Sequence, residues 1–199
     1  MLTTVASVKA SLQSQQGVNE TLIARLIKQV GARIEAATER WWEYAAREET
    51  LNGRASEYLY LRGAGIVADS VTVTVDGTEL VEDTDYYVDY ETGELWNSNG
   101  WEADADRKGV VVEYTAGYGY TDAGVVQVAP PVDLEGAVIA EVVAFHDTFK
   151  AGNRSGQDLV DIKTPFLTKA VQDFVAANKL PRYNDREKSA TSSPEGRFQ

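Results

Sequence analysis

The spacing of the apolar residues changes twice along this chain, and that change limits the possible folds more than any other feature. From Asn19 to about Trp42, apolar residues recur every three or four positions behind a good N-cap residue, as in an amphipathic helix. From Tyr44 apolar and polar residues alternate, which is typical of strands. A helical spacing returns after the pair Pro130–Pro131. This order predicts an α+β fold.

We predict a bundle of about four helices from caps, breaks and apolar spacing. In chain order they are expected from Thr3 or Thr4 to near Gly17, from Asn19 to about Trp42, from about Val132 to Phe149, and from about Pro165 to Asn178. The second helix has the clearest apolar stripe, which consists of Ile23, Leu26, Ile27, Val30, Ile34, Ala37 and Trp41.

The residues between the helices predict an inserted antiparallel β region of about five to six short strands. The strand segments are 57–62, 71–75, 86–90, 95–96 and 110–115, with turns at Asp76-Gly77 and Thr92-Gly93. The residues after Tyr120, through Gly124 to Pro131, are expected to form a loop. We therefore divide the chain into N-terminal helices (1–43), the β insertion (44–120), C-terminal helices (121–181) and a flexible C-terminal tail (182–199).

The negative charge is concentrated in one stretch. The chain has a formal net charge of −12, and the residues from Gly63 to Asp106 include twelve Asp and Glu residues but no Lys or Arg. Since that stretch alone carries −12, the rest of the chain sums to zero. Binding to duplex DNA requires clustered Lys and Arg. The stretch is either a solvated strand face or a surface that must not adhere to DNA, and a nucleic-acid reader is disfavoured.

The tail differs from the body in charge. Residues 182–199 have a net charge of +1, which leaves −13 for residues 1–181. Their polar composition is typical of segments that fold on contact with a partner. The charged residues of the tail are Arg182, Arg186, Lys188, Arg197, Asp185, Glu187 and Glu195.

Few residues could support catalysis or metal binding. There is no cysteine, and the single histidine, His146, is expected to be structural. Gly63-Ala64-Gly65 matches a dinucleotide-binding fingerprint, but a strand follows it instead of a helix, so a turn is expected. Residues 104–109 resemble the start of an EF-hand loop without its later oxygen ligands, which favours a polar turn. We predict no catalytic residue, no cofactor and no metal site.

The sequence does not predict a membrane protein. The N-terminal residues lack the basic and apolar regions of a signal peptide. No stretch approaches the ~18 apolar residues of a transmembrane helix. We expect a soluble protein with no membrane partner.

Aromatic residues gather around the β region, and three interpretations are open. They suit cross-strand pairs within a sheet, an interface with a partner, or stacking against sugar rings, and the first is favoured. The residues are Trp41, Trp42, Tyr58, Tyr60, Tyr86, Tyr87, Tyr90, Trp96, Trp101, Tyr114, Tyr118 and Tyr120.

Five short motifs, in their order and spacing, resemble the head–tail connector (adaptor) proteins of long-tailed bacteriophages. The second motif has Glu39 where the family typically has glycine. The motifs are Thr4-Val5-Ala6-Ser7-Val8-Lys9, Thr38-Glu39-Arg40-Trp41, the turn from Asp89 to Leu95, the strand from Val112 to Tyr118, and the helix start Pro131-Val132-Asp133-Leu134.

The resemblance implies a structural virion protein rather than an enzyme. Such proteins assemble as a homo-oligomeric ring of about twelve subunits beneath the portal protein. The ring extends the DNA channel, lets DNA pass without specific binding, and docks the next neck or tail protein, a stopper or tail terminator. The implied location is the head–tail junction of the virion, after synthesis in the cytoplasm of the host bacterium.

The resemblance also implies roles for two groups of residues. The C-terminal segment of relatives commonly reaches toward the portal, so portal binding is expected of Arg182, Tyr183, Arg186, Lys188, Arg197 and Phe198. The acidic β surface would either line the channel or face solvent, and its residues include Glu82, Asp83, Asp85, Asp89, Glu91 and Glu94.

Three alternatives remain at this point. Within the phage neck, the chain could be a tail-terminator or stopper protein. A carbohydrate- or ligand-binding β module would need Trp96 and Trp101 on one exposed flat face. An enzyme would need a pair of carboxylates in a deep cleft, and the sequence does not give their separation.

Overall fold

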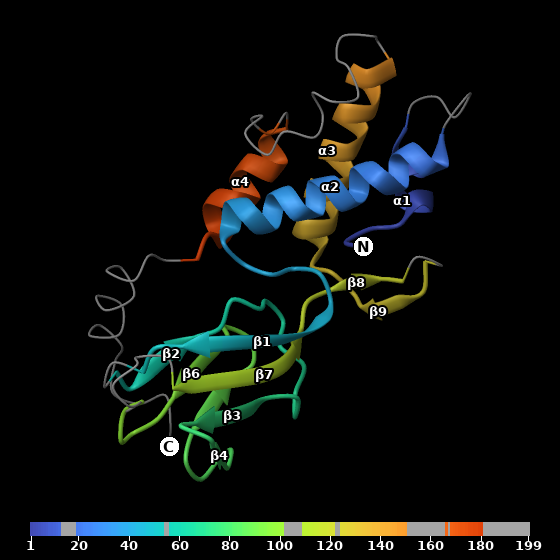
Figure 1. Cartoon of the computed structure of the whole chain (residues 1–199). Coiled ribbons are helices and arrows are strands. Elements are labelled where there is room, and N and C mark those ends of the chain that lie inside the picture. Colours follow the sequence, from blue (N-terminus) through green and yellow to red (C-terminus); the bar gives the residue numbers. More distant parts are fainter. Residues whose placement is uncertain are drawn as a thin grey trace.

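The structure of the chain, a computed structural model, describes residues 1–12, 19–53, 56–101, 109–121, 124–150, 166 and 168–180. Figure 1 shows a bundle of helices above a region of strands. The described helices are α1 (Val5–Ser11), α2 (Glu20–Thr38), α3 (Val132–Lys150) and α4 (Lys169–Asn178). The predicted α+β class, with a helical bundle and an antiparallel β region, is confirmed. None of these helices combines the length and hydrophobicity that a membrane span requires.

Local capping sets the starts of the first two helices. The Thr4 side chain accepts a hydrogen bond from the Ser7 amide at the start of α1, and Asn19 accepts one from the Leu22 amide at the start of α2. Both caps agree with the sequence prediction. The predicted end of the first helix and the predicted start of the fourth, Gly17 and Pro165, lie outside the described residues.

The second helix is shorter than its apolar spacing predicts. Helix α2 ends at Thr38 because Glu39 adopts a left-handed conformation with φ 59°. The predicted extension to Trp42 is therefore wrong. Trp41, which we assigned to the apolar stripe of the helix, instead forms a β-bridge with Gly63.

Nine short strands form three sheets in the described part of the chain, more than the five or six expected. One sheet has the order β1-β7-β3-β4, a second β2-β6-β5, and a third β8-β9. All the strand pairs are antiparallel. The strands are β1 (Ala45–Leu51), β2 (Tyr58–Tyr60), β3 (Thr72–Val75), β4 (Thr78–Leu80), β5 (Tyr87–Asp89), β6 (Glu94–Trp96), β7 (Val110–Ala116), β8 (Gly119–Tyr120) and β9 (Val126–Val128).

Five strands, β2, β3, β5, β6 and β7, correspond to the five predicted segments. Strand β4 follows the predicted turn at Asp76-Gly77 but was not predicted as a segment, and β1, β8 and β9 were missed. Strand β1 contains a single large apolar residue, Leu51, and is defined by its seven-residue pairing with β7. Strand β9 lies inside the loop predicted after Tyr120 and pairs with the two residues of β8 in a local hairpin. For β1, a partner strand distant in sequence decides the conformation, and local propensity does not.

Each half of the molecule has its own core. The helical core joins all four helices, and the β core fills the space between the two larger sheets. Trp42 and Ala64 belong to the helical core although they lie outside the helices. The largest buried residues of the β core are Trp101, Tyr86 and Tyr114.

The two halves meet at a joint formed by residues 35–44. The Glu35 carboxylate accepts hydrogen bonds from the backbone amides of Trp42 (2.8 Å) and Glu43 (3.0 Å). The Trp42 indole donates to the Thr38 hydroxyl at 2.9 Å, and its ring packs edge-on against Phe174 of α4, with centroids 5.1 Å apart. These contacts fix the direction in which the chain leaves α2.

The segment that follows β7 also hydrogen-bonds to the joint. The Trp42 carbonyl accepts a hydrogen bond from the Tyr118 amide at 2.7 Å, and the Tyr118 carbonyl accepts one from the Tyr44 amide at 3.0 Å. Gly117 permits this approach, because a Cβ there would lie 2.4 Å from the Glu43 carbonyl carbon, and its φ is +101°. The strand β7 is thereby tied to the chain that leaves α2.

A buried ion pair links three helices. The guanidinium of Arg33 lies 3.8 Å from the carboxylate of Glu141, and both side chains are almost fully buried. The second oxygen of Glu141 accepts hydrogen bonds from the amide and hydroxyl of Thr168, both at 2.9 Å, immediately before α4. Arg33 also lies over the rings of Phe145 and Phe166. The pair therefore positions the start of α4 against α2 and α3.

We predict that Arg33→Met lowers the free energy of unfolding by about 3–5 kcal/mol, because it leaves the Glu141 charge buried without its counter-ion. Adding Glu141→Gln should recover part of that loss, since a neutral amide oxygen can still accept the Thr168 amide. Urea unfolding of the variants measures both effects. The matched control is Arg25→Met, at an exposed arginine on the same helix. An equal loss in the two single variants would contradict the prediction.

Candidate interaction surfaces

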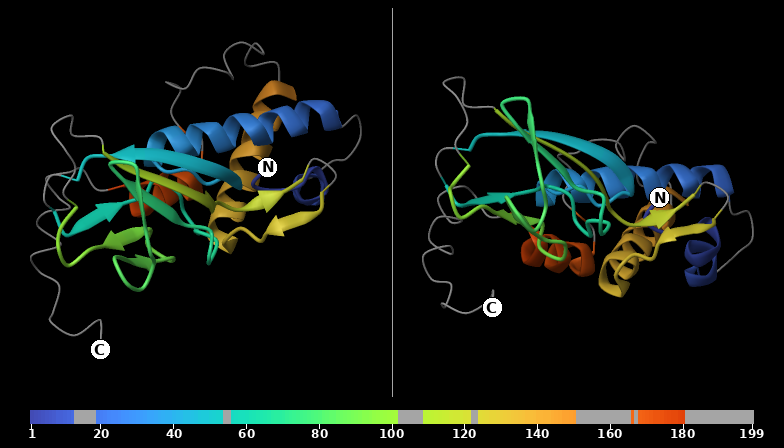
Figure 2. Two further views of the ribbon diagram at one scale, coloured as in Figure 1. Left: turned by 60° about the horizontal axis from the view of Figure 1, so that its bottom comes forward. Right: turned by 90° about the horizontal axis from the view of Figure 1, so that it is seen from below.

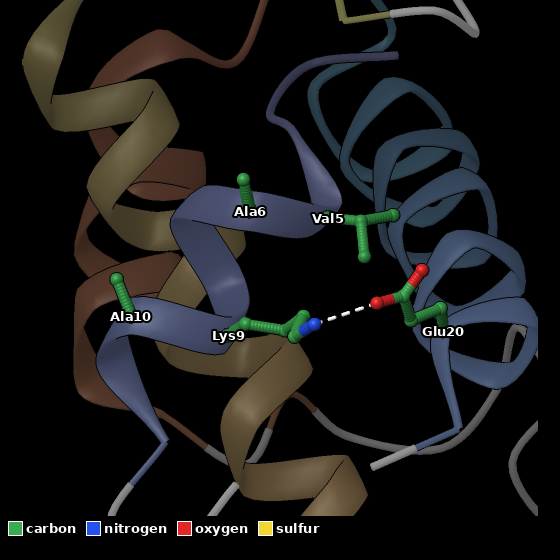
Figure 3. Close-up of a pocket in the computed structure, with 5 residues that line it drawn as sticks. All are labelled: Val5, Ala6, Lys9, Ala10 and Glu20. Carbon is green, nitrogen blue, oxygen red and sulfur yellow. Dashed lines mark hydrogen bonds and ion pairs between the residues drawn. The ribbon is translucent and has the colours of Figure 1, made fainter.

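An open groove of about 420 Å³ lies between α1 and the start of α2 (Figure 3). Its lining contains one ion pair, in which the Lys9 ammonium and the Glu20 carboxylate lie 2.6 Å apart. Lys9 holds the pKa of Glu20 below its ordinary value. The other lining residues are Val5, Ala6 and Ala10. This groove therefore provides neither a nucleophile nor a pair of acids for catalysis.

Three of the predicted acidic residues lie in the loop between β4 and β5, namely Glu82, Asp83 and Asp85. The other three are Asp89 on β5, Glu91 in the turn after it and Glu94 on β6. Asp83, Asp85 and Glu91 are exposed, and the other three are partly buried. Cations are absent from this surface over the described residues 63–101. The six acids do not share one end of the β region, because Glu91 lies near Tyr118 at the joint and, in addition to burial, helps to raise the pKa of that tyrosine.

Three of these acids also accept hydrogen bonds that stabilise the fold locally. The Asp85 carboxylate accepts the Val81 amide at 2.8 Å, and Asp89 accepts the amides of Glu91 (2.9 Å) and Thr92 (3.1 Å). The Glu82 carboxylate accepts the hydroxyl of Tyr90. Their presence is explained in part by local folding, so they are not all available to a partner.

Three buried or partly buried tyrosines lie beside carboxylates of the β region, Tyr86 and Tyr90 beside Glu82 and Tyr114 beside Glu49. Burial, and then the nearby charge of Glu82, raises the pKa of Tyr86 to about 12. Burial and the hydrogen bond to Glu82 raise the pKa of Tyr90 to about 12. Burial and a hydrogen bond to the Glu49 carboxylate also raise the pKa of Tyr114. All three phenols are therefore neutral at ordinary pH and donate hydrogen bonds.

Glu49 was not singled out by the sequence, although it lies at the centre of a buried polar cluster. Its carboxylate accepts the Tyr114 hydroxyl and the Arg62 amide, the latter at 2.8 Å. The Tyr114 hydroxyl in turn accepts the Gly63 amide at 3.0 Å. This cluster pins the loop after β2 to β1 and β7. The sequence carries no local signal for it, because its members are far apart in the chain.

Trp41 lies between two arginines at the joint. The guanidinium carbons of Arg47 and Arg62 lie 4.9 Å and 4.6 Å from the centre of its ring. Arg47 also donates to the Glu43 carbonyl at 2.9 Å, and Arg62 donates to the Glu39 carbonyl at 3.2 Å. These cations strengthen the joint and form part of the fold.

The aromatic residues mostly serve the interior and cross-strand pairs. Tyr87 of β5 faces Trp96 of β6 in register, with ring centroids 5.5 Å apart. Trp101 is only 1% exposed, and its indole donates to the Glu57 carbonyl at 3.0 Å. The carbohydrate-binding alternative required Trp96 and Trp101 on one exposed face, and the burial of Trp101 contradicts it.

The other residues that the sequence analysis considered as possible sites are placed as follows. His146 is buried on α3, and its Nδ1 lies 3.3 Å from the carboxylate of Asp147. Gly65 has φ +62° in a turn, and β3 follows it, as expected. No cluster of three metal-ligating side chains occurs among the described residues. The EF-hand-like segment 104–109, apart from Gly109, and every portal-binding candidate from Arg182 to Phe198 lie outside the described residues.

Comparisons with known proteins found no matching protein-family model and no matching curated protein. Solved structures do match. A chain in the neck of an empty gene transfer agent (GTA) particle, computed with C6 symmetry, has a TM-score of 0.59 and 18% identity, covering 89% of both chains.

Two further structures agree. A chain in the neck of the native GTA particle, computed with C12 symmetry, has a TM-score of 0.56 and 17% identity, covering 89% of this chain and 88% of the other. A chain in the virion of the native GTA particle has a TM-score of 0.57 and 15% identity, covering 89% of both. At these identities the similarity shows a shared fold along nearly the whole chain.

We predict that stability falls as pH rises above about 10. The unfolded chain ionises its tyrosines near pH 10, whereas Tyr86 and Tyr90 stay neutral to about pH 12 in the fold, so the unfolded state loses protons first. The stabilisation is complete below pH 10 and is lost between about 10 and 12. Urea midpoints at about pH 9 and about pH 11 measure it. Tyr86→Phe should reduce the difference, and equal midpoints in the native chain would oppose the prediction.

Proposed function

We propose that this chain is a structural, non-enzymatic subunit of the neck of a phage-like particle. The observation that carries the proposal is the match of the whole fold, 89% of the chain, to chains in GTA necks. A shared fold alone does not define a function. Here the agreement of the fold with the connector-like motifs of the sequence supports the same role from a second direction.

The motifs occupy the positions on which this fold depends. Thr4 caps α1, Thr38 accepts the Trp42 indole at the joint, and Glu39 ends α2. In the turn from Asp89 to Leu95, the Gly93 amide donates to the Asp89 carbonyl at 2.8 Å. The motif that ends at Tyr118 contains Gly117, where the chains cross. The resemblance thus concerns residues that determine the architecture, which strengthens it as evidence for the family.

The subunit is proposed to act in a ring of identical copies. The related neck structures were computed with C6 and C12 symmetry, which supports a ring and fits about twelve subunits. More finely, we propose the adaptor position below the portal, where the ring extends the DNA channel and docks the next neck or tail protein. A stopper or tail terminator is the second candidate, because neck similarity supports each of these components.

The charge distribution suits a channel through which DNA moves. Asp83, Asp85 and Glu91 are exposed, and the described residues 63–101 contain no Lys or Arg. Exposed acids without cations repel phosphates and let DNA slide. Whether these acids face the lumen or the exterior, they do not hold DNA.

We propose that residues 182–199 bind the portal protein through Arg182, Tyr183, Arg186, Lys188, Arg197 and Phe198. Deleting this segment should leave the unfolding midpoint within error and abolish the joining of heads to tails. Electron microscopy of particles made with the deleted chain measures the fraction of heads that carry tails. A matched control replaces Ser189, Thr191, Ser192 and Ser193 with alanine, which retains the cations and both aromatic residues. Normal particles from the deleted chain would refute the portal-binding role.

Ring formation can be measured separately from portal binding. Light scattering of the full chain, alone and with portal protein, should reveal a complex of about twelve copies of the 21.8 kDa subunit. A complex that forms only with the portal also supports the proposal, because the portal then templates the ring. A chain that stays monomeric in both cases, at concentrations where portal rings are intact, would contradict it.

A further inference from the structure

The sheet with the order β2-β6-β5 has two chemically different faces. Its inner face buries Leu59 and Leu95 in the β core and packs Val88 against it. Successive side chains of a strand point to opposite sides, so the residues that flank these three share the other face. We call this set the outer sheet face, and it consists of Tyr58 and Tyr60 of β2, Tyr87 and Asp89 of β5, and Glu94 and Trp96 of β6.

The strand register places three aromatic side chains in one row across the outer sheet face. Trp96 is paired with Tyr58 on one side and with Tyr87 on the other. The ring centroids of Tyr87 and Trp96 lie 5.5 Å apart, and Tyr87 is 38% exposed. The electron-rich faces of such rings attract cations.

A row of carboxylates lies beside the aromatic row. Glu94 is paired with Tyr60 on one side and with Asp89 on the other. The Oδ1 atom of Asp89 accepts the amides of the following turn, and a carboxylate can accept further hydrogen bonds through its second oxygen. The three strands contain no Lys or Arg, and Arg62, which follows β2, lies over the Trp41 ring. The outer sheet face is therefore suited to bind cations.

A segment near the C-terminus supplies matching cations. Residues 182–188 read Arg-Tyr-Asn-Asp-Arg-Glu-Lys. When such a segment lies extended on a sheet, Arg182, Arg186 and Lys188 point to one side, whereas Tyr183 and the two acids point to the other. One side thus carries three cations and no anion, although the segment as a whole has a net charge of +1.

The segment begins within reach of the outer sheet face. The last described residue, Leu180, is buried, and its amide donates to the Thr38 carbonyl at 2.8 Å at the joint. Figures 1 and 2 show the end of α4 on the side of the molecule on which β2 and β6 lie. Residues 181–188 can span about 26 Å when extended. Since a body of this size has a radius of gyration of about 16 Å, the segment can reach the β region of its own chain.

We propose that residues 182–188 dock with their cation side on the outer sheet face of their own chain. The cations stack on the aromatic row and pair with Glu94 and Asp89. The fold uses the same chemistry where Arg47 and Arg62 lie over Trp41. The contact opens without unfolding the body, so it does not set the midpoint of global unfolding.

This contact would compete with the portal, because the cations of residues 182–188 are among those proposed to bind it. A docked segment is held on the subunit until the portal offers a stronger site. Only this competition rests on the proposed function, and the contact itself can be tested in the free protein.

Trypsin measures how often the segment leaves the outer sheet face in the full chain, because it cleaves after Lys188 only when that residue is released. Cleavage after Arg197, outside the docked segment, is the reference within the same molecule. Trp96→Ala should raise the ratio of the two rates about threefold, the factor that one exposed cation–π contact contributes. Mass spectrometry of the chain at early times gives both rates.

Two further variants separate the effect of charge from an effect on folding. Glu94→Gln keeps the shape of the side chain and removes its charge, so it should raise the ratio about twofold. Val81→Ala, at an exposed valine of the β region that is not on the outer sheet face, should leave the ratio unchanged. Urea midpoints of the variants show that each one folds.

Cross-linking shows which copy holds the segment, and the chain has no cysteine to interfere. Asn184→Cys lies on the cation side, and Ser98→Cys is at an exposed residue just after β6. A short bis-maleimide should join the two within one chain and give a product of monomer mass. The matched control pairs Asn184→Cys with Thr78→Cys, at an exposed residue of β4 in the other sheet, and should not be joined.

The outcomes separate this inference from the proposed function. Equal cleavage ratios in the native chain and the Trp96→Ala variant would overturn the contact, as would a control pair that is joined equally well. A cross-linked product of twice the monomer mass would also overturn it, because the segment then lies on another copy. Protection and a cross-link of monomer mass, together with normal particles from the chain that lacks residues 182–199, would support the contact and contradict the portal role.

Discussion

Glu35 holds the chain at the point where the helical half of the molecule becomes the β half. Its carboxylate accepts two successive backbone amides, those of Trp42 and Glu43, just after a left-handed residue has ended α2. Trp42 can then enter the helical core, while the chain beyond it runs into β1. Because the chain just after β7 hydrogen-bonds at the same place through Tyr118, the start of β1 and the end of β7 are held together beside this carboxylate.

The charges of the two halves differ in a way that suits the proposed role. In the helical half, Arg33 and Glu141 form a buried pair that fixes α4. In the β half, some of the acids accept hydrogen bonds in turns and others are exposed. A subunit with a packed helical half and exposed acids that repel phosphates is well suited to surround DNA without binding it.

The sequence predicts those features that depend on interactions between residues close together in the chain. Thr4 and Asn19 were found as caps because a capping side chain bonds within its own first turn. The end of α2 was placed too late because Trp41 continues the apolar spacing past Glu39. Strand β1 was missed because its pairing with β7, and not its own residues, makes it a strand. The Arg33–Glu141 pair was missed for the same reason, although a charge at a core position of a helix is a usable signal.

The central claim is that this chain is a ring-forming subunit of a particle neck. Electron cryomicroscopy of intact particles tests it most directly, by fitting the fold, with its joint and its β8–β9 hairpin, to the density between head and tail. The account predicts a ring of identical copies at that junction, around the DNA channel. Density for this fold in the capsid shell or the tail tube, or its absence from the particle, would contradict it.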